Sequence, residues 1–120
     1  MTTELTSRQR RELRSHMLAE LVRLDERIET LARSSEDLSR DRELTSTDDE
    51  HDPDGTTVAV ELVHVNSLLR QARSDRKLMR DAQDRVETPG YGVCEQCAGH
   101  IGLERLLALP STTRCILCAR

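Results

Sequence analysis

Apolar residues recur every three or four positions over about residues 7–44, the spacing that lines one face of a helix. No Gly or Pro interrupts this segment. Thr6, just before this segment, and Gln9, near its start, fit a capping box, in which each side chain accepts a hydrogen bond from the other residue's backbone N–H. The pattern predicts a helix of roughly 57 Å with the heptad seam of a coiled coil. The seam residues are Met17, Leu21, Leu24, Ile28, Leu31 and Leu38, with an interruption at Ser35.

A second heptad pattern covers about residues 57–87 and predicts a second long helix. Two of its seam positions are polar, Arg76 and Gln83, and such residues can set the register of a coiled coil at some cost in stability. Thr88-Pro89-Gly90 ends the helix. The apolar seam consists of Val58, Leu62, Val65, Leu69, Ala72, Met79 and Val86.

Between the two patterns, about residues 45–56 form an acidic break without Lys or Arg. Its Ser, Thr, Asp, Pro and Gly residues are typical of turns. The following helix is capped either by Asp52, with Pro53 at the first helical position, or by Thr56 or Thr57. The acidic residues of the break are Asp48, Asp49, Glu50, Asp52 and Asp54.

Two arrangements of the helices fit these patterns: an antiparallel hairpin with the acidic turn at its tip, or one extended rod that dimerises. The Asp-Pro-Asp-Gly sequence of residues 52–55 favours the hairpin. Antiparallel pairing would place Leu38 near Leu62, Leu31 near Leu69, and Leu21 near Met79. We therefore expect a mainly α protein, with a coiled-coil hairpin over residues 1–89 and a small C-terminal unit over residues 90–120 that contains all four cysteines.

Composition narrows the classes of function. The 120 residues include no Trp, no Phe and one Tyr, and the formal net charge is -4. An acidic chain lacks the Lys/Arg excess that binding to nucleic-acid phosphates requires, and a single Tyr is a poor stacking platform for single strands. No stretch approaches the roughly 18 apolar residues of a membrane span, and the polar N-terminus shows no secretory segment. We expect a cytoplasmic protein without membrane or direct DNA binding.

All four cysteines belong to two CxxC pairs, Cys94–Cys97 and Cys115–Cys118, separated by 17 residues. This spacing is typical of a tetrahedral zinc site with four thiolate ligands. Four sulfur ligands leave no open coordination position for a catalytic water, so we expect one structural Zn²⁺ and no enzymatic activity. The alternatives are a redox CxxC, which lacks its βαβ background here, and a disulfide pair, which is disfavoured in a reducing cytosol. His100 could replace a cysteine ligand.

Residues around the cysteines resemble the zinc finger of the DksA/TraR family. That finger reads roughly YGxCxxC, then IxxxRLxAxP, then CxxC, with matching gaps. The hairpin with an acidic tip also resembles the longer members. The matching positions are Tyr91, Gly92, Cys94, Cys97, Ile101, Arg105, Leu106, Ala108, Pro110, Cys115 and Cys118.

The resemblance implies a regulator that binds bacterial RNA polymerase rather than promoter DNA. Members insert the coiled coil into the secondary channel, where the acidic tip approaches the catalytic magnesium and alters the stability of promoter complexes. They often act with the alarmone guanosine tetraphosphate. The helix that follows the finger in longer members, which contributes to alarmone contacts, has no counterpart after Cys118, and this argues against alarmone dependence.

The tip departs from the family's DxxDxA motif. Counted back from the first cysteine, the second Asp falls on Asp54, the first on His51 and the Ala on Thr56, so only Asp54 matches. A shifted register uses Asp49 and Asp52 but puts Asp54 where the Ala belongs. The candidate tip residues are Asp49, His51, Asp52 and Asp54.

Two other functions fit the sequence. A coiled-coil adaptor could use the same structural zinc without any polymerase contact, and the acidic turn would then be a solvated loop. A DNA-binding finger is disfavoured by the net acidity and by the lack of a basic stripe. Arg105 either contacts polymerase, pairs with Glu104 or caps the finger's short helix.

Overall fold

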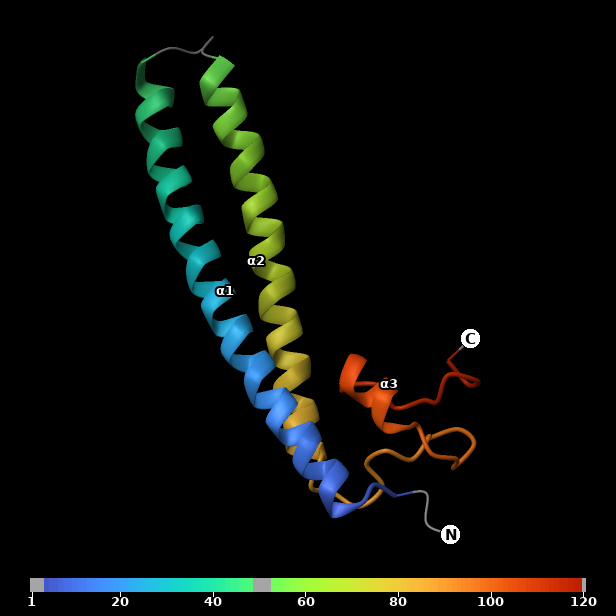
Figure 1. The fold of residues 1–120 in the computed structure, drawn as a ribbon. Coiled ribbons are helices and arrows are strands. Elements are labelled where there is room, and N and C mark those ends of the chain that lie inside the picture. The colour runs from blue at the N-terminus through green and yellow to red at the C-terminus, as the bar shows by residue number, and fades with distance from the viewer. Residues whose placement is uncertain (1–3, 49–52, 120) are drawn as a thin grey trace. The chain divides into compact units, whose positions relative to one another are not determined.

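The computed structural model describes residues 4–48 and 53–119, with side chains left out of the description over residues 45–56. Three helices form within these described residues: α1 (Ser7–Asp48), α2 (Pro53–Arg85) and the short α3 (Leu103–Ala108) (Figure 1). Within the described ranges no strand is present, and the only β pairing there is an isolated antiparallel bridge between Val93 and His100. The mainly α class, with two long helices packed against each other, is confirmed.

The start of α1 and the end of α2 lie within two residues of their predicted positions. The predicted capping box is present: the Thr6 N–H donates to Oε1 of Gln9 at 3.0 Å, and the Gln9 N–H donates to Oγ1 of Thr6 at 3.1 Å. Helix α2 stops at Arg85, two residues before its predicted end, and the Thr88 N–H donates to the Arg85 carbonyl at 2.9 Å.

The predicted break over residues 45–56 was too long. Helix α1 continues to Asp48. Residues 45–48 are weak helix formers, but none of them is Gly or Pro, so no residue stops the helix before Asp48. Helix α2 begins at Pro53, where the fixed φ of proline suits a first helical position. Of the three caps left open by the sequence, Thr56 and Thr57 lie inside the helix, and Asp52 falls outside the described residues.

The residues group into two compact units, each described here by itself. One, which we call the arm, comprises Arg23–Asp75. The other, which we call the finger unit, comprises Met1–Val22 together with Arg76–Arg120. The domain boundary that the sequence predicts between residues 89 and 90 stays a prediction. No helix in the described part of the chain combines the length and the apolar character needed to cross a bilayer.

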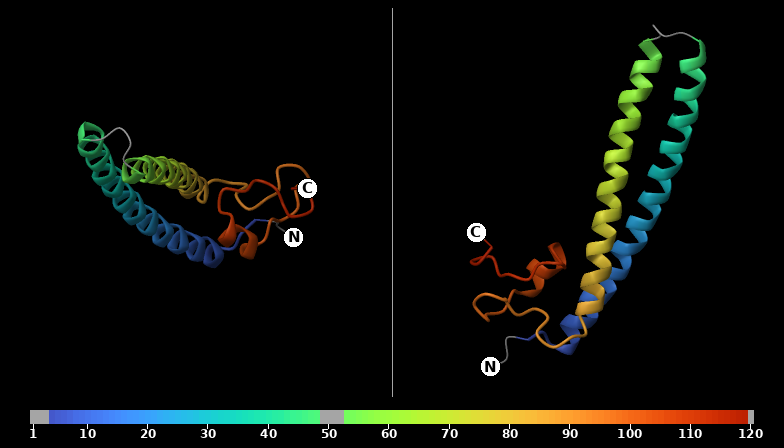
Figure 2. Two further views of the ribbon diagram at one scale, coloured as in Figure 1. Left: turned by 90° about the horizontal axis from the view of Figure 1, so that it is seen from above. Right: turned by 180° about the vertical axis from the view of Figure 1, so that it is seen from behind.

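In the arm, α1 and α2 lie side by side, as the two further views also show (Figure 2). Leu62, Leu69 and Ala72 are buried between the helices. The Ser35 hydroxyl, which interrupts the apolar seam, lies 2.6 Å from Oδ1 of Asn66. This polar pair agrees with the predicted register, which puts residue 31 opposite residue 69. It also satisfies the two polar groups within the seam.

In the finger unit, helix and finger side chains share one hydrophobic core. Ala82 is fully buried there and the adjacent Gln83 only partly, although the heptad pattern placed Gln83 in the seam. A straight helix drifts from a strict seven-residue repeat, which moves the buried face by one position. The core residues are Leu13, Met17, Ala82, Val86, Tyr91, Cys94, Ile101, Leu106 and Cys115.

Leu13→Ala should lower the free energy of unfolding by about 2–5 kcal/mol, because the Leu13 side chain is 0% exposed and its removal leaves a cavity. Leu18→Ala is the matched control, since Leu18 is 54% exposed on the same helix. Urea denaturation followed by circular dichroism measures both. Equal losses for the two variants would contradict the buried position of Leu13.

Candidate metal centre

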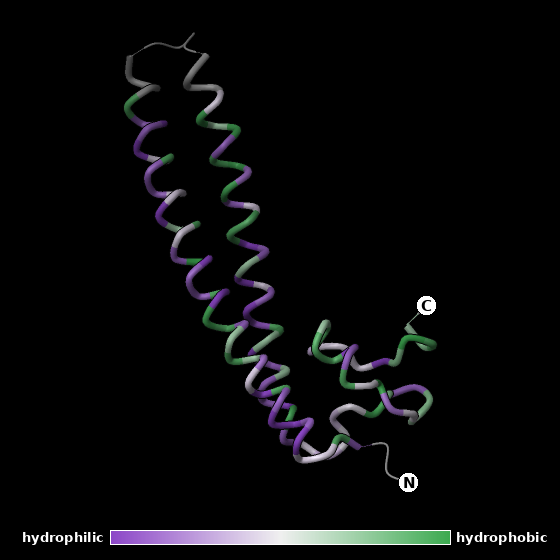
Figure 3. Tube along the Cα trace, in the orientation of Figure 1, coloured by the Kyte–Doolittle hydropathy of each residue, from purple (hydrophilic) through white to green (hydrophobic). Residues whose placement is uncertain are grey.

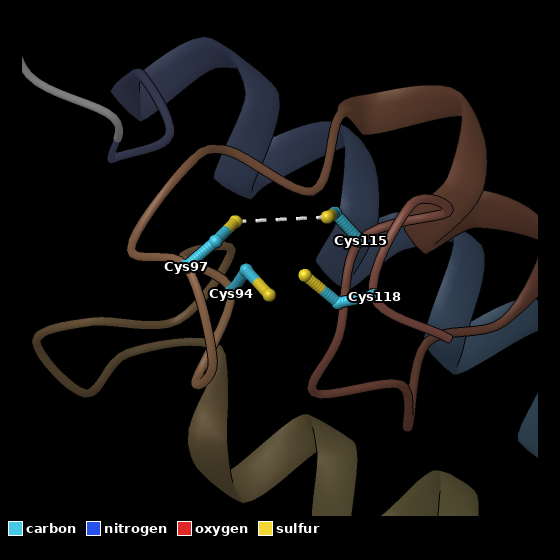
Figure 4. A group of neighbouring side chains, drawn as sticks. All are labelled: Cys94, Cys97, Cys115 and Cys118. Carbon is cyan, nitrogen blue, oxygen red and sulfur yellow. Dashed lines mark hydrogen bonds between the residues drawn. The ribbon is translucent and has the colours of Figure 1, made fainter. Parts of the chain in front are cut away.

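Four cysteine side chains converge at one point of the finger unit (Figure 4). The sulfur atoms of Cys94, Cys97, Cys115 and Cys118 all lie within 4.8 Å of one another. The Sγ atoms of Cys97 and Cys115 are 3.7 Å apart. Two sulfurs of a tetrahedron with 2.3 Å bonds to a central Zn²⁺ would be about 3.8 Å apart, so the separation fits a shared metal. All four cysteines are free, and 3.7 Å is far beyond a disulfide bond.

Each CxxC pair sits on a tight turn held by backbone hydrogen bonds. In the first turn, the Ala98 N–H donates to the Cys94 carbonyl at 3.0 Å, and Ala98 has a positive φ of 62°. In the second, the N–H groups of Cys118 and Ala119 donate to the Cys115 carbonyl at 3.1 and 3.0 Å. Each turn thereby directs its two sulfurs to the same side of the backbone.

Contacts between the two turns bring the cysteine pairs together. The Glu95 N–H donates to the Thr113 carbonyl at 2.9 Å, and the Glu95 carboxylate accepts from Nε of Arg114 at 3.1 Å. The hydrogen bond from Arg114 lowers the pKa of Glu95, so this carboxylate is charged at neutral pH. Nε of Arg105 donates to the Arg114 carbonyl at 3.0 Å, immediately before Cys115.

The core beneath the turns fixes the finger in place within its unit. The Tyr91 hydroxyl donates to the Pro110 carbonyl at 2.9 Å, and burial raises the pKa of Tyr91. Gly92 has a φ of +90°, and a side chain there would meet Leu5 at 2.9 Å, so only glycine fits. This contact with Leu5 was not foreseen from the sequence, because no spacing rule links a residue before the first helix to the finger.

The pKa values of three of the thiols are shifted in different directions. Hydrogen bonds from the backbone of Cys115, and then of Cys97, lower the pKa of Cys94 to about 6. Hydrogen bonding to the side chains of Cys115 and Cys97 raises the pKa of Cys118 to about 12. The backbone of Cys118 lowers the pKa of Cys115. A cation that binds all four sulfurs must displace the remaining protons, as thiolate coordination of zinc does.

The other residues singled out from the sequence lie outside this cluster. His100 is exposed, and the metal-capable group contains cysteines only. Of the candidate tip residues, Asp49, His51 and Asp52 fall outside the described residues. Asp54 is the second residue of α2, in the arm.

Similarity to known proteins agrees with a four-cysteine zinc site. The family described as prokaryotic dksA/traR C4-type zinc finger matches residues 89–120. The RNA polymerase-binding transcription factors DksA of Escherichia coli (strain K12) and Salmonella typhimurium are each 34% identical over 83 residues, covering 65% of this chain and 55% of theirs. The chain thus spans about half the length of these relatives.

Among solved structures, transcription factor DksA2 from Pseudomonas aeruginosa matches with a TM-score of 0.78 and 25% identity, covering 94% of this chain and 81% of that one. Fold and site together define a helical hairpin protein with a four-cysteine zinc finger and one structural zinc. Residues 89–120 match the DksA/TraR zinc finger, and the chain as a whole is similar to the DksA proteins named above.

Cys94→Ser should abolish zinc binding and lower the melting temperature, because the binding energy of a structural zinc is also folding energy. His100→Ala should keep one zinc per chain, since the exposed His100 is outside the sulfur cluster. Metal content by atomic emission and thermal denaturation measure both.

A chelator should lower the melting temperature of the unaltered protein in the same way as Cys94→Ser. A thermal transition that the chelator leaves unchanged would refute a structural metal, and loss of zinc in His100→Ala would refute the four-cysteine ligand set.

Proposed function

We propose that this chain is a non-enzymatic bacterial transcription regulator that binds RNA polymerase through its secondary channel. The arm would enter the channel, its tip would approach the active centre, and the four cysteines would hold a purely structural zinc. The observation that carries the proposal is the combination of a long two-helix arm with a C4 finger, which this chain shares with proteins named as RNA polymerase-binding transcription factors.

The charge of the arm supports this function. Residues 23–75 contain fourteen acidic and seven basic residues. The rest of the chain has an excess of basic residues, with eleven against eight. An acidic arm is attracted to a pore lined by basic side chains, and carboxylates at its tip are suitable partners for a hard divalent cation or for the basic groups around it. The same charge is unsuited to DNA, so we propose contact with the polymerase and not with the promoter.

The proposed tip consists of Asp54 with Asp49, His51 and Asp52. Asp54 is the central candidate, because it matches the family motif and lies in the first turn of α2. Negative charge near a helix N-terminus is stabilising in general, so a substitution of Asp54 can also change the stability of the helix. Any test of Asp54 therefore has to separate helix stability from action on transcription. Arg105 donates a hydrogen bond to the Arg114 carbonyl. We also propose that Arg105 contacts the polymerase. The setting for all of these contacts is the cytoplasm.

An adaptor that docks another protein through the same arm is the second candidate function. The incomplete tip motif, with His51 and Thr56 at two of its three positions, favours it. Competition on purified bacterial RNA polymerase separates the two functions. A channel-binding protein should suppress, in a saturable manner, transcript cleavage stimulated by a factor that uses the same pore. An adaptor should leave cleavage unchanged well above micromolar concentration.

Asp54→Asn should abolish the effect on transcription while leaving polymerase binding largely intact, because the substitution removes a charge at the tip and not the docking surface. Glu36→Gln is the matched control, since it neutralises an exposed carboxylate elsewhere in the arm. In vitro transcription and the cleavage competition measure the two properties, with circular dichroism to check helix stability. An Asp54→Asn protein that retains the full effect would exclude the tip mechanism.

A further inference from the structure

The residue before the cap of α1 packs on the finger. Leu5 directly precedes Thr6, whose hydroxyl caps α1. A short hydrophobic stretch is visible there in Figure 3, next to the largely hydrophilic first turns of the helix. An apolar residue at this place commonly packs against the fourth residue of its own helix, but the fourth residue of α1 is the charged Arg10. Leu5 packs against the hydrophobic core that contains Cys94 and Cys115.

The contact between Leu5 and the finger lies at Gly92, two residues before the first cysteine. A β-carbon at residue 92 would lie 2.9 Å from Cγ and 3.2 Å from Cδ1 of Leu5. The Leu5 side chain therefore occupies the space that a side chain of residue 92 would need. Gly92 permits this close approach because it has no side chain.

Gly92 also begins the loop that carries the first cysteine pair, residues 92–101, which we call the first knuckle. The Ile101 N–H donates to the Gly92 carbonyl at 2.8 Å, and the Cys94 N–H donates to the Gly99 carbonyl at 2.7 Å. These two hydrogen bonds join the two ends of the loop. A metal held by four sulfurs leaves only after one of the cysteine turns has opened locally.

We propose that Leu5 is a clasp that holds the first knuckle closed and thereby slows the release of zinc. Opening of the knuckle moves Gly92 away from Leu5 and exposes their apolar contact to water, which lowers the population of the open state. The capping box ties the backbone of Thr6 to α1, so Leu5 keeps its place when the knuckle moves. Leu5 is a positioning residue, which acts on the metal through Gly92. This role is independent of polymerase binding.

Zinc release from the loaded protein to an excess of a chromogenic chelator measures the effect of the clasp. Leu5→Ala should raise the release rate at least about fivefold, because most of the apolar contact is lost. Leu5→Met keeps the side-chain volume and should stay close to the wild-type rate. Glu4→Ala is the matched control, since it truncates the exposed neighbouring residue. The far-ultraviolet circular dichroism of the long helices should be the same in all these proteins.

A double-mutant cycle tests whether Leu5 acts through Gly92. Gly92→Ala has two costs in the wild-type background, which are the strain of a positive φ and the close contact with Leu5. In the Leu5→Ala background the close contact is gone and only the strain remains. Gly92→Ala should therefore accelerate zinc release less in the Leu5→Ala protein than in the wild-type protein, by about threefold or more.

Four results would overturn the clasp. They are a wild-type release rate in Leu5→Ala, equal acceleration by Glu4→Ala, independent effects of the two substitutions in the cycle, and a loss of helix signal in Leu5→Ala that parallels the faster release. The last result would assign Leu5 a general structural role. If Gly92→Ala binds no zinc in either background, the single variants decide, because equal rates for Leu5→Ala and Leu5→Met reject the clasp and a slow rate in Leu5→Met alone supports it.

Discussion

Four sulfur atoms have to meet at one point, and two short backbone turns have to bring them there. The turns at Cys94–Cys97 and Cys115–Cys118 are too small to bury a core of their own. They are held by each other through Glu95 and Thr113, and by the side chains of Tyr91 and Ile101 packed with residues of α1 and α2. Metal binding and burial therefore depend on one another, as is usual in small zinc domains.

Sequence reasoning predicted the elements whose signals are local. The capping box at Thr6 and Gln9, the periodicity of the two long helices and each CxxC pair depend on residues a few positions apart. It was wrong about the length of the tip, because weak helix formers after residue 44 continue a helix already under way and Pro53 starts the next one. It also missed the contact of Leu5 with Gly92, which arises only when distant segments pack and leaves no periodic signal.

The uneven distribution of charge along the chain matches the two roles that we propose, which are polymerase binding by the arm and metal binding by the finger unit. The finger unit carries the metal and most of the fully buried side chains, so its sequence is constrained by packing. The arm has a narrow seam of Leu62, Leu69 and Ala72 with a polar pair at Ser35 and Asn66. Its outer surface is free to vary with the partner. The excess of acidic over basic residues in residues 23–75 is compatible with a basic partner and unfavourable for self-association.

Tyr91 has a consequence of a different kind. It is the only aromatic residue among Phe, Trp and Tyr in the chain, and it lies buried in the finger unit with its hydroxyl on the Pro110 carbonyl. The near-ultraviolet absorption and fluorescence of this protein therefore come from one side chain, a few residues from the first cysteine. Light at these wavelengths reports on the finger alone, without any added label, while the arm remains spectroscopically silent.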